Sequence, residues 1–199
     1  TLRDGSQGEG VSFTVRDKLA VTTKLDELGV AYVEGGWPGS NPRDAEYFDE
    51  VRKLSLRHAK LAAFGSTARP GKAPSRDENV KALLAAETPV VTIVAKTWKR
   101  QVLDALRIEP EENLELIDKT VRYLSERDDE VILDAEHCFD GHASDPEYAL
   151  ACLHTAAQAG AAVLCLCDTR GGSLPEAITL GVRAAAAAGR RGRRGPRRC

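Results

Sequence analysis

The sequence lacks several features that would place it in a familiar class. Its 199 residues include no methionine, no apolar run near the roughly 18 residues that a membrane-spanning helix needs, and no basic-then-apolar leader. Cysteine occurs five times, an odd number that argues against a disulfide-stapled secreted domain. We therefore expect reduced thiols, no membrane partner and a cytoplasmic location. The missing methionine indicates a fragment or an incomplete reading frame.

Negative charge dominates the body of the chain but is absent from its end. The formal net charge is −2, yet residues 189–199 (GRRGRRGPRRC) hold six arginines and no acid, which leaves a body of net charge −8. An acidic body is not typical of nucleic-acid-binding proteins, so we do not expect a nucleic-acid partner. We interpret residues 189–199 as a disordered tail or the product of a shifted reading frame. A basic arm that binds nucleic acid is the alternative.

Apolar β-type runs alternate with helical patterns along the chain. Five strands are expected at residues 31–34, 60–65, 89–95, 130–134 and 162–167, with a truncated first strand at 1–2. Helical patterns are expected at residues 14–29, 75–84, 111–124, 146–159 and 174–188, and another begins at 41–42. Strand–helix units of about 30 residues predict βαβ crossovers and a parallel sheet. Both an open doubly wound sheet and part of an eight-stranded (β/α) barrel fit this pattern.

Capping residues support several of these helices. Thr14 with Asp17, and Ser75 with Glu78, have the spacing of capping boxes. The pairs at residues 41–42 (NP) and 145–146 (DP) combine a capping side chain with proline at the first helical position. On the first helix, the apolar residues at 21, 25 and 28 are expected to form the buried face.

Polar residues stand where the expected strands end. These positions are Arg3 and Asp4, Glu34, Lys96, Asp134 and Glu136, and Asp168 and Thr169. In a barrel, the carboxyl ends of the strands carry the functional residues. Several carboxylates that converge there need a compensating cation, and oxygen ligands favour Mg²⁺ or Mn²⁺. The alternative is that each acid is a solvated strand end or a helix cap.

Six segments in this order resemble the DRE-TIM metallolyases, a family that includes isopropylmalate, homocitrate and citramalate synthases and hydroxymethylglutaryl-CoA lyase. The segments are 1–7 (TLRDGSQ), 33–42 (VEGGWPGSNP), 64–69 (FGSTAR), 86–89 (AETP) with 96–98 (KTW), 134–141 (DAEHCFDG) and 165–175 (CLCDTRGGSLP). The second segment is most similar to the citramalate synthase branch. The resemblance implies an α/β fold, an incomplete (β/α)₈ TIM barrel of about six βα units over residues 1–188.

The resemblance also implies a reaction. It is a metal-dependent acyl transfer, the Claisen condensation of acetyl-CoA with pyruvate to give (R)-citramalate and CoA. Alternatives are an isopropylmalate or homocitrate synthase, a lyase that runs the reverse reaction, or, in another class, an inactive fragment with a basic arm. The implied metal is Mg²⁺, Mn²⁺ or Zn²⁺, and the complete enzyme is expected to be a homodimer.

Roles follow for the residues that match the family's motifs. The resemblance assigns catalysis to Arg3 and Glu136, substrate binding to Gln7, Glu34, Asp134 and Thr169, and metal binding to Asp4. Within this scheme Arg3 stabilises the developing alkoxide and Glu34 orients Arg3.

One part of the family pattern is missing. The family's further metal ligands are two histidines in an H-x-H motif, and the 199 residues contain no such motif. We expect His58 and His154 to lie in helices, and His137 and His142 not to replace the missing pair. We therefore expect weak or no turnover from the chain as written.

Two cysteines and two tryptophans are harder to interpret from the sequence. Cys165 and Cys167 form a C-x-C pair that we expect to be buried in a core strand, with a metal or redox role as the alternative. Trp37 and Trp98 follow strand ends, and Trp98 is expected either to wall the substrate pocket or to pack on its rim.

Overall fold

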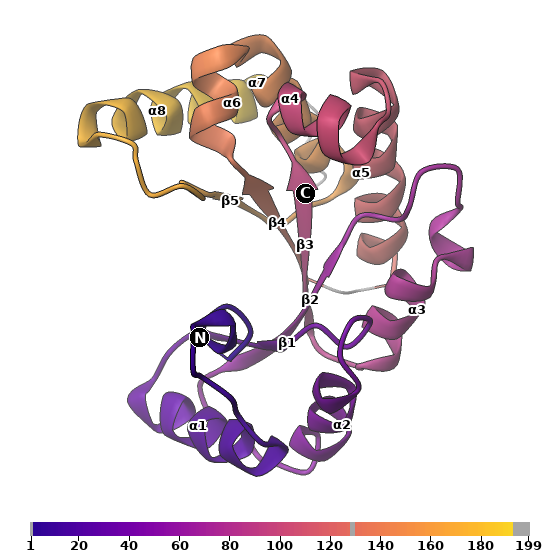
Figure 1. The fold of residues 1–199 in the computed structure, drawn as a ribbon, viewed down its shortest axis with the longest axis vertical. Coiled ribbons are helices and arrows are strands. Elements are labelled where there is room, and N and C mark those ends of the chain that lie inside the picture. Colours follow the sequence, from indigo (N-terminus) through magenta and orange to yellow (C-terminus); the bar gives the residue numbers. More distant parts are fainter. Residues whose placement is uncertain (1, 128–129, 193–199) are drawn as a thin grey trace, which may run out of the picture.

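The computed structural model describes residues 2–127 and 130–192 of the chain. Its centre is a sheet of five parallel strands in the order β1-β2-β3-β4-β5. The strands are β1 (Tyr32–Gly36), β2 (Lys60–Ser66), β3 (Val90–Lys96), β4 (Glu130–Glu136) and β5 (Val163–Leu166). The sheet curves, with helices on its convex side and its concave side open toward the left of Figure 1. The predicted parallel α/β sheet is therefore confirmed.

Helices connect the strands. The first is α1 (Val15–Leu28), which follows a short 3-10 helix η1 (Gly5–Gln7) and precedes β1. Then come α2 (Pro42–Val51), η2 (Pro74–Arg76), α3 (Glu78–Ala85), α4 (Lys99–Gln101), the π-helical η3 (Val102–Leu106) and α5 (Pro110–Ser125). The remaining helices are α6 (Cys138–Ser144), α7 (Pro146–Ala159) and α8 (Pro175–Gly192). Within the described ranges, no helix combines the length and the apolarity needed to cross a bilayer.

Of the predicted first strand at residues 1–2, only residue 2 lies within the described part of the chain. Leu2 has no strand conformation, although its side chain is fully buried in the core. A ladder needs several paired residues, so a single described residue contributes packing rather than a strand. The described part of the chain thus has five strands, not six.

Most of the predicted helix starts are confirmed. Thr14 forms the capping box with Asp17, and Asn41 and Asp145 cap helices that begin with proline. The capping box predicted at Ser75 is wrong, because Ser75 lies in η2 and the cap of α3 is Asp77, whose carboxylate accepts from the N–H groups of residues 79 and 80. An ionised cap interacts more strongly with a helix N-terminus than a neutral hydroxyl does.

The buried face predicted for α1 is also wrong. Residues 21 and 25 are half-buried and Leu28 is 76% exposed, whereas the buried residues are Lys18, Thr22 and Asp26. The reason is that polar contacts attach this helix to its neighbours. The Thr22 hydroxyl hydrogen-bonds the hydroxyl of Tyr47 on α2, and Asp26 accepts from the backbone of residues 57–59.

β4 shows how the sheet separates the core from the concave side. Its buried residues Val131, Leu133 and Ala135 belong to the core shared with α5 and α7. Asp134 and Glu136 alternate with them and are half-buried, so both acids point to the other face of the sheet. On α5, residues 117, 121 and 124 are fully buried and belong to the same core.

The last helix passes the position where we expected a tail to begin. Residues 189–192 continue α8, which ends at Gly192. The remainder of the predicted tail, residues 193–199, lies outside the described residues.

Candidate active site

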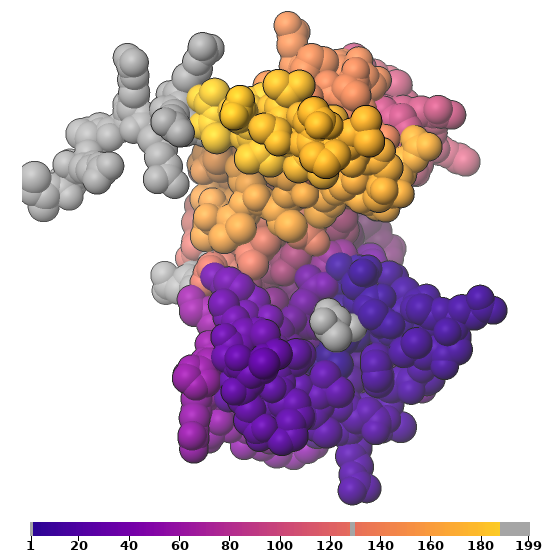
Figure 2. Space-filling model, turned by 90° about the vertical axis from the view of Figure 1, so that its left-hand side faces the viewer, coloured from indigo at the N-terminus to yellow at the C-terminus, as the bar shows by residue number. Residues whose placement is uncertain are grey.

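The carboxyl ends of the strands surround a hollow of ≈ 810 Å³ on the concave side of the sheet. Figure 2 shows that side of the molecule, with α8 in yellow above and the N-terminal segment and α1 in indigo below. All seven residues to which the sequence assigned a role line this hollow: Arg3, Asp4, Gln7, Glu34, Asp134, Glu136 and Thr169. The structure therefore brings together positions that are up to 166 residues apart in the sequence.

Arg3 is held from two sides. Its Nε donates a hydrogen bond of 2.7 Å to Oε1 of Glu34, which lies on β1. Its guanidinium carbon lies 3.7 Å from the ring centroid of Phe64 on β2, a cation–π contact. Both side chains of the Arg3–Glu34 pair are about one-fifth exposed or less, so water screens the pair only in part. The contact matches the orienting role predicted for Glu34, and that role stays a prediction.

β1 has an irregularity directly after Glu34. Glu34 pairs with residue 62 and Gly36 with residue 63, so Gly35 is an extra residue in the strand. A side chain at Gly35 would place its Cβ 2.3 Å from the Tyr47 ring, which only glycine avoids. Behind the bulge, the buried Lys18 donates to the carbonyl oxygen of Gly35 at 2.9 Å and forms an ion pair with Asp44. These contacts fix the end of β1 from the helix side.

Trp37 forms one wall of the hollow. Its backbone N–H donates to Asp44 at 2.8 Å, and its indole Nε1 donates to Asn79 at 2.6 Å. Its ring meets Phe64 edge-on with the centroids 5.3 Å apart. Trp98, in contrast, does not line the hollow and lies against the ring of His137 with a centroid separation of 5.6 Å. Of the two alternatives for Trp98, packing at the rim is the one that the structure favours.

Glu136 has a cationic partner, Lys96, which the sequence analysis placed at a strand end but to which it gave no role. Lys96 ends β3, Glu136 ends β4, and the two are paired in the register of the sheet. Their side chains form an ion pair, and both line the hollow. The signal for this partner was present, because both residues close strands of equal length in adjacent βα units.

Thr169 follows β5 and faces the other end of the hollow. Its Oγ1 accepts a hydrogen bond of 2.9 Å from the backbone N–H of His137, the residue after β4. A hydroxyl that accepts in this way keeps its own hydrogen free to donate. Next to it, Asp168 accepts from the backbone N–H and the hydroxyl of Ser173, which fixes the loop between β5 and α8.

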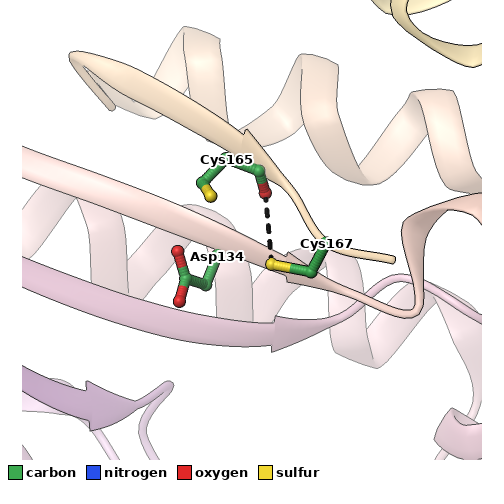
Figure 3. Close-up of side chains that lie close together, drawn as sticks. All are labelled: Asp134, Cys165 and Cys167. Carbon is green, nitrogen blue, oxygen red and sulfur yellow. Dashed lines mark hydrogen bonds between the residues drawn. The ribbon is translucent and has the colours of Figure 1, made fainter. Parts of the chain in front are cut away.

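Asp134 lies beside two thiols. Burial, and then the nearby charge of Glu34, raise the pKa of Asp134 above its usual value. Its carboxylate and the sulfur atoms of Cys165 and Cys167 lie within 4.8 Å of one another. In Figure 3 the Cys165 sulfur points toward Asp134, and the Cys167 sulfur donates to the Cys165 carbonyl oxygen at 3.7 Å.

The prediction that these two cysteines are buried is wrong. Cys165 is exposed and Cys167 is half-buried, because both face the hollow from β5, an edge strand of the described sheet, and from the residue just after it. A hydrogen bond from the Cys167 thiol lowers the pKa of Cys165, and making that bond raises the pKa of Cys167.

The described residues do not complete a metal site around Asp4. The Asp4 side chain is 75% exposed and touches Arg3, with 3.3 Å between Nη1 and Oδ1. None of the four histidines lines the hollow. His154 lies in α7 as predicted, but His58 lies in the loop before β2 and not in a helix. Asp4 alone therefore does not fit the family's metal ion.

The five parallel strands follow one another in sequence order, and acids, a fixed arginine and a threonine lie at their carboxyl ends. This arrangement is typical of (β/α)-barrel enzymes. A family model described as HMGL-like matches residues 1–188, and the chain belongs to this family. The (R)-citramalate synthase of Aquifex aeolicus (strain VF5) is 54% identical over 178 residues, which cover 89% of this chain and 34% of that protein. The 2-isopropylmalate synthase of Shouchella clausii (strain KSM-K16) is 31% identical over 179 residues, 90% of this chain and 33% of that protein.

The solved structures agree with the fold. Hydroxymethylglutaryl-CoA lyase from Pseudomonas aeruginosa matches with a TM-score of 0.73 at 21% identity, over 94% of this chain and 62% of that one. The predicted family and the predicted TIM-barrel fold, of which this chain covers a part, are confirmed. The chain spans about a third of the length of the curated relatives that it matches.

Proposed function

We propose that this chain carries the oxo-acid side of the active site of an enzyme that condenses acetyl-CoA with pyruvate. The products are (R)-citramalate and CoA. The observation that carries the proposal is the convergence of all seven motif-derived residues on one hollow at the carboxyl ends of the strands. The similarity to (R)-citramalate synthases, at higher identity than to a 2-isopropylmalate synthase, supports pyruvate as the oxo acid.

The reaction requires that one carbon–carbon bond is made and one thioester bond is cleaved. The acetyl methyl group loses a proton and attacks the ketone carbon of pyruvate, whose oxygen gains the negative charge. Water then cleaves the thioester and releases CoA.

Arg3 is the residue suited to the charge on the ketone oxygen. Its Nε is occupied by Glu34 and its face by Phe64, so the donors that remain point in a restricted set of directions. Donors that are fixed before the charge develops stabilise it with little reorganisation. Glu34 acts here as a positioning residue.

Two further residues bind the carboxylate of pyruvate and take part in proton transfer. The free hydroxyl hydrogen of Thr169 donates to the carboxylate of pyruvate, because its oxygen already accepts from the backbone of His137. Glu136, beside Lys96, takes part in proton transfer. Asp134 and Gln7 line the same hollow and contact the substrate there. Asp4 is the metal ligand that the family motif implies.

Binding of the oxo acid tests the proposal independently of turnover. We expect saturation-transfer NMR, with Mg²⁺ present, to detect pyruvate on the folded chain and to detect 2-oxoisovalerate more weakly. 2-Oxoisovalerate is larger than pyruvate by two methylene equivalents, and each such step discriminates by about 10- to 200-fold, so a titration of each acid is needed. Thr169→Val and Arg3→Lys are expected to abolish the pyruvate signal.

Glu130→Gln is the control variant for these substitutions at the hollow. Glu130 begins the strand that Glu136 ends, and it also contacts a lysine, Lys60 at 2.6 Å, but it lies away from the hollow. Pyruvate binding should be unchanged in Glu130→Gln. Equal binding of both acids, or full pyruvate binding in Thr169→Val, would refute the proposal. Mass spectrometry of reactions with acetyl-CoA should detect little or no citramalate, because the sequence has no H-x-H motif.

The resemblance also carries two proposals about the complete enzyme, namely that it is a homodimer and that it is cytoplasmic.

A further inference from the structure

A second set of metal-ligating atoms lies in the hollow, apart from Asp4. It consists of Asp134 on β4, Cys165 on β5 and Cys167 directly after β5. Asp134 and Cys165 are paired in the register of the sheet, and Cys165 and Cys167 are two residues apart on an extended segment. Three potential ligands thus point to the same space from two adjacent segments (Figure 3).

The distances between these ligand atoms are close to the ligand–ligand distances around a tetrahedrally coordinated ion. Zinc lies about 2.3 Å from sulfur and about 2.0–2.2 Å from a carboxylate oxygen, so two ligands of one tetrahedral ion lie about 3.8 Å apart. The atoms of this cluster all lie within 4.8 Å of one another. Rotamer adjustments of about 1 Å are enough to close the set around an ion.

The donor atoms select the kind of ion. Thiolates favour soft or borderline ions such as Zn²⁺, whereas Mg²⁺ and Ca²⁺ prefer oxygen ligands alone. The surroundings favour a cation as well, because Glu34 and Asp4 add negative charge near Asp134, against the positive charge of Arg3. Cys165 is exposed, so an ion can reach the cluster from the hollow.

We propose that Asp134, Cys165 and Cys167 form a binding site for a thiophilic divalent ion of the zinc class, with three protein ligands and an open fourth position. The open position faces the hollow, where a water molecule or an anionic ligand completes the coordination. This site differs in its donors from the oxygen- and histidine-based site that the family resemblance implies around Asp4.

Cobalt reports on the site directly, because Co²⁺ bound to thiolates shows a charge-transfer band in the near ultraviolet and intense visible bands when it is tetrahedral. The experiment uses the reduced 199-residue chain without oxygen, in a Cys199→Ser background that removes the one cysteine outside the described residues. We expect one Co²⁺ per chain, both sets of bands, and complete displacement by Zn²⁺.

Variants separate this site from other thiols. Cys165→Ser and Cys167→Ser should each weaken Co²⁺ binding by about 100-fold or more, because even an outer partner of a metal ligand is worth 10- to 100-fold. Asp134→Asn should weaken binding but keep the charge-transfer band, since both sulfurs remain. Cys152→Ala is the matched control, because the Cys152 thiol is fully buried in α7 and should leave binding unchanged.

Absence of the charge-transfer band from the folded, reduced chain would overturn the proposal, and so would its persistence in Cys165→Ser or Cys167→Ser. Far-UV circular dichroism of each variant shows whether a lost band reflects lost folding. Thr169→Val should bind Co²⁺ normally. This variant therefore distinguishes failure of the metal site from failure of the pyruvate site.

Discussion

Replacement of the buried lysine of α1 should destabilise the protein more than any change to a surface ion pair. Lys18 is 2% exposed and contacts the carboxylate of Asp44 and the carbonyl oxygen of Gly35. Lys18→Met preserves the length of the side chain and removes its charge and its donors. Asp44 is then a buried carboxylate whose remaining described partner is the backbone N–H of Trp37, at 2.8 Å.

The magnitude follows from two opposing effects. Removing one partner of a buried ion pair costs about 3–5 kcal/mol, because the other charge stays desolvated. Asp44 lies in the first turn of α2, where the helix dipole recovers about 0.3–1 kcal/mol, or up to about 2 in partly buried geometries. We therefore expect a loss of about 3 kcal/mol, a large part of the roughly 5–15 kcal/mol that stabilises a typical domain.

Urea unfolding followed by circular dichroism measures this loss. Lys24→Met is the matched control on the same helix, because Lys24 is 76% exposed in its pair with Glu27 and should cost less than about 1 kcal/mol. The double variant Lys18→Met/Asp44→Asn should recover at least about half of the loss, since asparagine still accepts from Trp37 and carries no charge. A loss below about 1 kcal/mol in Lys18→Met, or no recovery in the double variant, would refute the reasoning.

Two further changes probe other contacts. The backbone N–H groups of Ala59, Arg57 and His58 lower the pKa of Asp26 to about 2, below its value of 3.8 in an unstructured chain. The ionised carboxylate therefore stabilises the fold above pH 3.8, and this stabilisation is lost as the pH falls toward 2. Asp26→Asn should therefore lower the urea midpoint at pH 7 and flatten its dependence on pH between about 4 and 2; an unchanged pH profile would contradict this. Gly141→Ala should cost at least about 1–3 kcal/mol, because the new Cβ would lie 2.5 Å from the carbonyl oxygen of Thr97. Gly172→Ala, whose added carbon meets nothing within 4 Å, is its control in the same unfolding assay, and equal midpoints for the two variants would show that the close approach is relieved at no cost.

The strands and most helix ends could be predicted because local signals specify them. The strand of residues 90–96 is nearly continuously apolar, as expected when both faces of a strand are covered. The face of α1 could not be predicted, because its buried side is made of polar groups whose partners lie on α2 and in the loop before β2. No periodicity within one helix contains that information.

The residues of the hollow could be predicted from motifs, and the family resemblance also implied that Glu34 orients Arg3, but other contacts at the hollow could not be predicted. The cation–π contact of Arg3 with Phe64 and the hydrogen bond of Thr169 with the backbone of His137 join separate segments, and no pattern within one segment indicates them. The exposure of Cys165 was missed because an apolar run gives no sign of which strand will lie at the edge of the described sheet.

The way in which Glu34 and Phe64 hold Arg3 has a consequence for binding affinity. A free arginine side chain has about 2 kcal/mol of rotamer entropy, which a ligand must remove when it orders the side chain. Here folding has already restricted Arg3 between a carboxylate and an aromatic ring. Since 1.4 kcal/mol corresponds to a tenfold change, an anion that binds Arg3 gains up to about 30-fold in affinity over one that meets a mobile arginine.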